Sequence, residues 1–300
     1  MLKRKYGKRK CRKRNAGRRN RRSKDLTKGR DEMGKPRFSI IDQCTWEVPR
    51  NELIMPETEE IRAKNLRMEI PVYCVYIEHP DLGKILFDTG VSHEWQKSWN
   101  PTMKSLYKIR YLNALEEKLA ELGTSPEQID LLIISHLHYD HAGNIRLFSN
   151  TKAGRKIMIS RSEAREAFVR VNLDDSGYSG VYLKSEFCDL PGIGYQLIDG
   201  DVHLADGLDL FVQNGHTPGV IGMRIETEES GTYIFCSDAC YSALNFGPPT
   251  KLPGLVMDPE GYVQNMERIR AMKEKYKARI VYAHDVEDFM KWEKSPYMYK

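Results

Sequence analysis

The chain has 300 residues, enough for one large domain or two small ones, and its hydrophobic content of 40% is sufficient for a core. No apolar run approaches the roughly 20 residues of a membrane-spanning helix, and no apolar segment follows the basic N-terminus as it does in a secretory signal peptide. We therefore expect a cytoplasmic protein with no membrane partner.

The charge is divided unevenly along the chain. Residues 1–37 hold 18 Lys and Arg and 3 acidic residues, a balance of +15, so the remainder holds 47 − 18 = 29 basic and 42 − 3 = 39 acidic residues, a balance of −10. This composition predicts a disordered basic tail over 1–37 and a domain over 38–300. The tail could contact nucleic acid, or be a solvated arm, or precede a true start at Met33; the acidic body argues against an extended nucleic-acid surface.

The six cysteines form no Cys-x-x-Cys pair. Because the chain is long and has no signal peptide, we expect reduced thiols in or near the core, as in cytoplasmic proteins. They are Cys11, Cys44, Cys74, Cys188, Cys236 and Cys240.

The first half of the body is predicted to begin with strands at 38–46, 71–78 and 84–87, which are rich in β-branched and aromatic residues. The segment 91–111 then carries large apolar residues in a connection, which indicates either a flap over a pocket or a segment that packs on the body. Leucines at helical spacing predict a helix over 111–122, with Gly123 at its end. Ser125, Pro126 and Glu127 have the pattern of a further helix start.

The second half is predicted to alternate short strands with two helices. A buried strand at 130–134 is followed by a strand at 156–159 and a helix at 162–172, and 173–195 reads as loop. A helix at 259–276 carries Val263, Met266, Ile269 and Met272 on one face. Further strands are predicted at 195–198, 209–212, 222–226, 232–236 and 278–283.

A histidine-rich segment follows the predicted strand at 130–134. On an extended backbone the rings of His136 and His138 point the same way, so both can reach one metal ion. Asp140 and His141 follow after the chain has begun to turn, so they can face a second ion. Ligand-type side chains crowded at the end of a strand suit metal binding better than packing.

Three more ligand-type residues each lie just after a predicted strand, and these are His216, Asp238 and His284. Strand ends of a layered α/β domain converge on one edge, so the simplest interpretation is a single site that joins them to 136–141. His79, His93 and His203 lack such a context and are predicted to be surface or loop residues.

Seven ligands are too many for one tetrahedral ion, so the sequence predicts two divalent ions. Mixed imidazole and carboxylate ligands suit zinc best, with iron, manganese or cobalt as alternatives. Two neighbouring ions can supply a hydroxide near neutral pH. The predicted division is His136, His138 and His216 on one ion, Asp140, His141 and His284 on the other, and Asp238 as the bridge.

These motifs resemble those of the metallo-β-lactamase superfamily over most of the body, from about Phe38 to Phe289. The resemblance implies an αβ/βα four-layer sandwich with a dinuclear site on one edge, and an aspartate at Asp88 that orients a ligand. The matching segments, in order, are Phe87-Asp-Thr-Gly90, Ser135-His-x-His-x-Asp-His-Ala-Gly143, Gly215-His-Thr-Pro-Gly219, Ser237-Asp238 and Ala283-His-Asp285.

Within the superfamily the chain is most similar to the N-acyl-homoserine lactonases. Asp238-Ala-Cys-Tyr241 resembles their Asp-Ala-x-Tyr, whose tyrosine contacts the lactone carbonyl. The resemblance therefore implies a lactone substrate, with Tyr241 donating to the oxyanion and Asp140 carrying a proton to the leaving alkoxide. The oligomeric state stays open.

Three other functions stay open as alternatives. A thioesterase of the glyoxalase II type would carry a C-terminal substrate domain, whereas few residues follow His284. An RNA nuclease would suit the basic tail but would carry an inserted domain. A non-enzymatic RNA-binding protein would have lost ligands, and none of the seven is missing.

Overall fold

The computed structural model describes residues 34–173 and 175–300. The disordered basic tail was predicted over 1–37, and its residues 1–33 lie outside the described residues. The first strand begins at Arg37, one residue before the predicted start of the body, and Lys35 already forms an ion pair with Glu226. Among the described helices, none is both long and apolar enough to cross a membrane.

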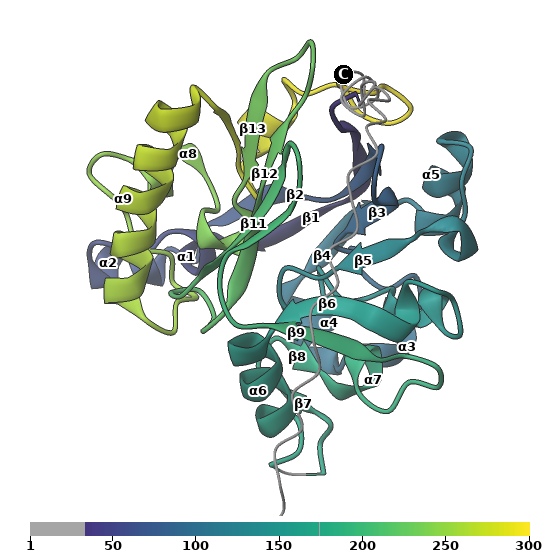
Figure 1. Ribbon diagram of the computed structural model, residues 1–300. Coiled ribbons are helices and arrows are strands. Elements are labelled where there is room, and N and C mark those ends of the chain that lie inside the picture. The colour runs from purple at the N-terminus through teal and green to yellow at the C-terminus, as the bar shows by residue number, and fades with distance from the viewer. Residues whose placement is uncertain (1–33, 174) are drawn as a thin grey trace, which may run out of the picture. The chain divides into compact units, whose positions relative to one another are not determined.

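The first of two large sheets has seven strands in the order β4-β1-β2-β3-β5-β6-β9 (Figure 1). Its longest pair is antiparallel, with Ile40 of β1 opposite Val75 of β2. Both segments form strands because they are rich in β-branched and aromatic residues. β3, β5, β6 and β9 then run parallel. The strands are β1 (Arg37–Pro49), β2 (Arg67–His79), β3 (Gly83–Phe87), β4 (Lys108–Leu112), β5 (Leu131–Ile133), β6 (Ile157–Ser160) and β9 (Tyr195–Ile198).

The second sheet has five strands in the order β10-β11-β12-β13-β14. Only its last pair, β13 and β14, is parallel. A two-stranded ladder stands apart from both sheets. The strands are β10 (Val202–Ala205), β11 (Leu208–Gln213), β12 (Val220–Glu226), β13 (Thr232–Phe235) and β14 (Arg279–Val281), with β7 (Tyr178–Ser179) and β8 (Tyr182–Leu183) in the ladder.

The described helices are short, apart from α6 and α9. They are α1 (Arg50–Leu53), α2 (Glu59–Ala63), α3 (Trp95–Ser98), α4 (Pro101–Leu106), α5 (Leu115–Glu121), α6 (Arg161–Arg170), α7 (Lys184–Phe187), α8 (Ala243–Phe246), α9 (Pro259–Tyr276) and α10 (Val286–Phe289). Short 3₁₀ turns are η1 (Pro126–Gln128), η2 (Ile145–Phe148), η3 (Gly154–Lys156) and η4 (Ser237–Ala239).

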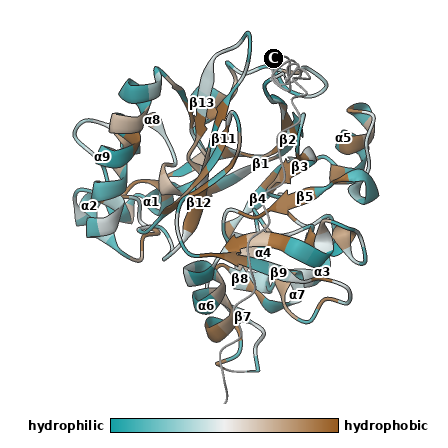
Figure 2. Cartoon of the chain, in the orientation of Figure 1, coloured by the Kyte–Doolittle hydropathy of each residue, from teal (hydrophilic) through white to brown (hydrophobic). Residues whose placement is uncertain are grey.

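The two sheets face each other across a shared apolar core. Phe38 of β1 meets the rings of Tyr233 and Phe235 on β13 edge-on, at centroid distances of 4.8 and 5.3 Å. Figure 2 shows hydrophobic residues concentrated on the strands. Burial of such apolar surface is the main stabilising contribution to a sheet-on-sheet packing.

Helices cover the outer face of each sheet. Ala164 and Ala167 of α6 and Leu115 and Leu119 of α5 are buried against the first sheet, and Met266 of α9 is buried against the second. α9 is largely hydrophilic on its other side (Figure 2). The layers are therefore helix, sheet, sheet, helix, which confirms the predicted αβ/βα four-layer sandwich.

Several local predictions were wrong. Residues 111 and 112 belong to β4 and pair with β1, so the helix predicted from 111 begins only at Leu115. The predicted helix start at Ser125 yields a single 3₁₀ turn. Val263 was predicted to lie on the apolar face of α9, but its side chain is 37% exposed because Tyr262 takes the inward position. β10 was not predicted.

His79 is buried, contrary to the expectation of a surface or loop residue. Its Nε2–H donates to the Asp206 carbonyl at 2.9 Å, and its Nδ1 accepts from the Asp81 N–H at 3.1 Å. Both ring nitrogens are therefore satisfied without solvent, and the residue is structural. His93 and His203 are exposed, as predicted.

The segment 91–111 packs on the body rather than standing free as a flap. Trp99, Met103 and Tyr107 are buried with Trp46 of β1 in one apolar cluster. Tyr139, which lies between His138 and Asp140 in the chain, joins it, with its ring centroid 5.0 Å from that of Trp99. The segment consequently supports the histidine-rich loop from one side.

Candidate metal centre

Four strand ends bring the seven predicted ligands together. The loop after β5 carries His136, His138, Asp140 and His141, and the strands β11, β13 and β14 of the second sheet are followed by His216, Asp238 and His284. All seven side chains are buried. Their donor atoms form two groups, and within each group every atom lies within 4.8 Å of the others. The first group is His136, His138, His216 and Asp238, and the second is Asp140, His141, Asp238 and His284.

In the first group, three ring nitrogens converge. The Nδ1 of His138 lies 3.0 Å from Nε2 of His136 and 2.9 Å from Nε2 of His216. An Asp238 oxygen, Oδ2, lies 3.2 Å from the His216 nitrogen and 3.6 Å from that of His136. This is the arrangement of donors around one shared ligand position.

In the second group, Asp238 offers its other oxygen. Its Oδ1 lies 3.1 Å from Nε2 of both His141 and His284, and Oδ2 of Asp140 lies 3.6 Å from the same two nitrogens. Each oxygen of Asp238 therefore faces a different group of histidines, as a bridging carboxylate does. The assignment of an ion to each group stays a prediction.

Hydrogen bonds on the far side of three rings fix which nitrogen is free. Nδ1–H of His141 donates to the Asp88 carboxylate at 2.9 Å, that of His216 to the Leu255 carbonyl at 3.1 Å, and that of His284 to the Pro71 carbonyl at 2.9 Å. With Nδ1 protonated, each Nε2 presents a lone pair to the site.

The electrostatics separate the two groups. Burial lowers the pKa of His136 and His138 well below the usual value, and that of His216 below it, so these rings are neutral and able to ligate. Burial also acts to lower the pKa of His141 and His284, but the Asp238 and Asp140 carboxylates outweigh it and raise both.

The residues fit a pair of divalent ions. In the second group, Nε2 of His141 and Oδ1 of Asp238 are both buried, and neither has a hydrogen-bond partner among the described residues. Both are acceptors when the proton of His141 is on Nδ1, so they cannot bond to each other. Unsatisfied buried polar atoms cost free energy unless something binds them, and a cation would satisfy both at once.

Tyr241 lies beside the first group rather than apart from it. Its hydroxyl is 2.9 Å from Nδ1 of His216, and its side chain is buried. Because Nδ1–H of His216 also donates to Leu255, the phenol oxygen accepts from the same N–H and its own proton remains available to a substrate.

The model of the metallo-beta-lactamase superfamily matches residues 67–284 of this sequence, which include all seven ligand-type residues. The chain belongs to the metallo-beta-lactamase superfamily. The match and the paired His/Asp groups together make it a metal-dependent hydrolase with a dinuclear site.

Curated relatives within this superfamily share about three residues in ten with the chain. The N-acyl homoserine lactonase AiiA of Bacillus thuringiensis subsp. kurstaki is 31% identical over 226 residues, which are 73% of this chain and 83% of that protein. The N-acyl homoserine lactonase AiiB of Agrobacterium fabrum (strain C58 / ATCC 33970) is 29% identical over 273 residues, which are 86% of this chain and 96% of that protein.

A solved structure shares the metallo-beta-lactamase fold of this chain. It is an N-acyl homoserine lactone hydrolase with the product N-hexanoyl-L-homoserine bound at the catalytic metal centre. The two chains superpose with a TM-score of 0.74 at 26% identity, over 89% of this chain and 100% of the other.

Other residues of this metallo-beta-lactamase site were not predicted from the sequence. Ser135 donates its hydroxyl to Asp88 at 2.8 Å and accepts from the Ser237 hydroxyl at 2.8 Å. The Leu255 and Pro71 carbonyls hold histidines through backbone atoms, for which a sequence carries no signal. The two serines belong to the matching motifs, and this membership was the only sign of them in the sequence.

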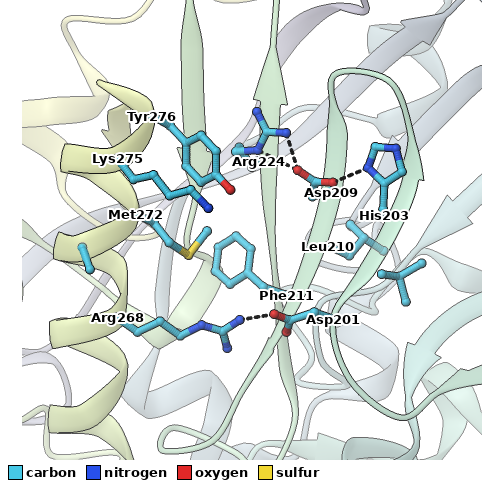
Figure 3. Close-up of a pocket in the computed structure, with 12 residues that line it drawn as sticks. Asp201, His203, Asp209, Leu210, Phe211, Arg224, Arg268, Met272, Lys275 and Tyr276 are labelled. Carbon is cyan, nitrogen blue, oxygen red and sulfur yellow. Dashed lines mark hydrogen bonds and ion pairs between the residues drawn. The ribbon is translucent and has the colours of Figure 1, made fainter.

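A second concave region lies away from the metallo-beta-lactamase site, between α9 and the second sheet (Figure 3). This groove has a volume of about 470 Å³. Its charged groups pair with one another, since Arg224 donates to Asp209 at 2.7 Å and Arg268 pairs with Asp201. None of its lining residues belongs to either group of ligands.

Proposed function

We propose that this protein is a dizinc lactonase that opens the ring of N-acyl homoserine lactones, and so quenches quorum signals. The observation that carries the proposal is the Asp238 carboxylate, whose two oxygens each lie within 3.2 Å of histidine nitrogens of different groups. The named activity of the two curated relatives and of the solved structure supports the choice of substrate.

The proposed ligand set is the one predicted from the sequence. His136, His138 and His216 hold one ion, Asp140, His141 and His284 hold the other, and Asp238 bridges them. The donor set of five imidazoles and two carboxylates supports zinc. Magnesium and calcium prefer oxygen ligands, whereas zinc binds imidazole nitrogen well.

Bound ions would polarise the lactone carbonyl and make hydroxide available at neutral pH. The side chains supply the remaining steps. Tyr241 donates a hydrogen bond from its hydroxyl to the oxygen on which negative charge develops. Asp140 takes the proton that the attacking water releases and returns it to the leaving alkoxide.

A cytoplasmic location is part of the proposal and is supported by the thiols. Five cysteines are free and buried, and no disulfide occurs among residues 34–173 and 175–300. They are Cys44, Cys74, Cys188, Cys236 and Cys240.

The test combines metal content with a substrate panel. Purified protein is expected to hold two zinc ions per chain and to release one proton for each acyl homoserine lactone opened, with loss of activity in chelator and recovery on adding zinc. A glyoxalase-type thioester and a structured RNA complete the panel. Hydrolysis of either at a higher kcat/KM than the lactones would contradict the proposed substrate.

A further inference from the structure

Glu163 makes a long-range contact that its local sequence does not predict. It follows Ser160 by three residues at the start of α6, and the Ser160 hydroxyl accepts from the Glu163 N–H at 3.1 Å. Such a Ser-x-x-Glu pattern normally turns the glutamate back onto the N-cap N–H. Here, Oε1 of Glu163 instead accepts from the Leu137 N–H at 2.9 Å.

Leu137 lies between two members of the first group. Fixing its N–H fixes the backbone from which the rings of His136 and His138 project, so the contact sets the direction of both rings. Glu163 itself is 0% exposed, and burial raises its pKa, while the facing Thr217 hydroxyl and Leu137 N–H lower it.

The same helix start also holds the loop that carries His216. The Ser160 hydroxyl donates to the Gly219 carbonyl at 2.6 Å. A Cβ at Gly219 would meet the hydroxyls of Ser160 and Ser162 and would lie 2.9 Å from the Glu163 nitrogen. Only glycine allows this loop to pack so closely on α6.

A third contact reaches His138 from the side. The ring of Tyr182 lies 4.6 Å from that of His138, and the two residues form an isolated β-bridge. The start of α6 and the residues that face it thus touch every loop that supplies histidines to the first group.

The second group is held by other residues. His141 is fixed by Asp88, and His284 by the Pro71 carbonyl. Asp88 also accepts from the Ser135 N–H at 2.7 Å, so it braces the loop at the end nearest β5. The Ser135 hydroxyl, which donates to Asp88, also lies 3.1 Å from Nδ1 of His136, so this contact serves both groups. Glu163, by contrast, contacts the backbone between His136 and His138.

We propose that Glu163 is a positioning residue for the first metal position alone: through the Leu137 N–H it holds His136 and His138 in ligating geometry, as Asp88 does for His141, while Ser160 at the same helix start holds the loop of His216. This inference rests on the ligand assignment proposed above. Glu163 lies outside the superfamily motifs, yet it would influence metal affinity and therefore turnover.

The experiment compares Glu163→Ala and Glu163→Gln with the wild type and with Glu166→Ala. Glu166 is the matched control, because it lies one turn along α6 and its half-buried carboxylate pairs with Arg170. Zinc is withdrawn with graded chelator, the remaining ions per chain are counted, and anomalous diffraction identifies which position has emptied.

Glu163→Ala is expected to lose zinc from the first position at roughly 10-fold or more lower chelator concentration, while the second position is unchanged. Glu163→Gln keeps a carbonyl acceptor for Leu137 and should recover most of the affinity, and Glu166→Ala should match the wild type. Gly219→Ala disturbs the same junction from the other loop, should show the same selective loss, and serves if Glu163→Ala does not fold.

Two results would overturn the role of Glu163: full retention of both ions in Glu163→Ala, or equal loss of both. A wild-type protein that binds fewer than two ions would instead overturn the ligand assignment, so the two failures are distinguishable.

Discussion

The carboxylate of Asp88 accepts from Nδ1–H of His141 at 2.9 Å, and it does so from a residue with a φ of +62°. A non-glycine residue in the left-handed region is strained, and such strain persists where surrounding contacts determine it. Here the contacts are the Ser135 N–H and hydroxyl, both bonded to the same carboxylate. Asp88 thus directs the free nitrogen of His141 into the site.

Replacing this carboxylate should weaken one metal position. Asp88→Asn removes the charge and one of the acceptors shared by His141 and Ser135, so we expect zinc affinity at the second position to fall by about 10- to 100-fold. Competition with a chromogenic chelator measures this. Asp81→Asn in the exposed turn after β2 is the control, and equal affinities for the two variants would contradict the assigned role.

Asp238 should be required for both positions. Asp238→Ala removes the only carboxylate whose oxygens face both groups of histidines, among the described residues. Five buried imidazoles then have a single carboxylate left to balance two divalent charges, so we expect loss of both ions and of lactone turnover. Metal analysis that still finds two ions per chain would show that Asp238 is not the bridge.

Much of the fold could be predicted because its signals are local. Runs such as Val72–Ile77 and Ile157–Ile159 are apolar and β-branched, and they form strands where the sequence places them. The helix predicted at 111–122 forms only from Leu115, because Tyr111 and Leu112 pair with Thr45 and Cys44, a tertiary contact that overrides leucine spacing.

The site was predictable to the extent that its residue types are rare and its strand ends converge. The supports of the ligands were less so. Glu163 reaches Leu137 across 26 positions, and Leu255 holds His216 through a carbonyl, neither of which leaves a pattern in the sequence. His79 was misjudged because its partner, the Asp206 carbonyl, comes from a turn far along the chain.

Tyr241→Phe should separate catalysis from metal binding. Leu255 still accepts from Nδ1–H of His216 in this variant, so we expect two ions per chain as in the wild type. Loss of the hydrogen bond from the hydroxyl to the oxyanion should lower kcat on acyl homoserine lactones by about 100-fold, as for other oxyanion donors. Unchanged turnover would rule out the donor role, and loss of zinc would show that the phenol mainly holds His216.

Glu186 gives a prediction for stability against pH. Burial raises its pKa from the ordinary 4.5 to about 8. Among the residues that the structure describes, its carboxylate accepts only a 3.3 Å hydrogen bond from the Ser98 hydroxyl to Oε1, and Oε2 has no partner. Between these two pKa values the folded chain binds more protons at this position than the unfolded chain. The free energy of unfolding therefore falls as pH rises through this range, by up to about 1.4 kcal/mol per unit.

The Glu186→Gln variant tests this prediction because its side chain cannot ionise. Its free energy of unfolding should rise steadily relative to that of the wild type from pH 5 to 8. Urea unfolding of both proteins across this range measures the difference, in which the shared metal contribution cancels. A difference that does not change with pH would show that Glu186 ionises in the folded protein as readily as in the unfolded one.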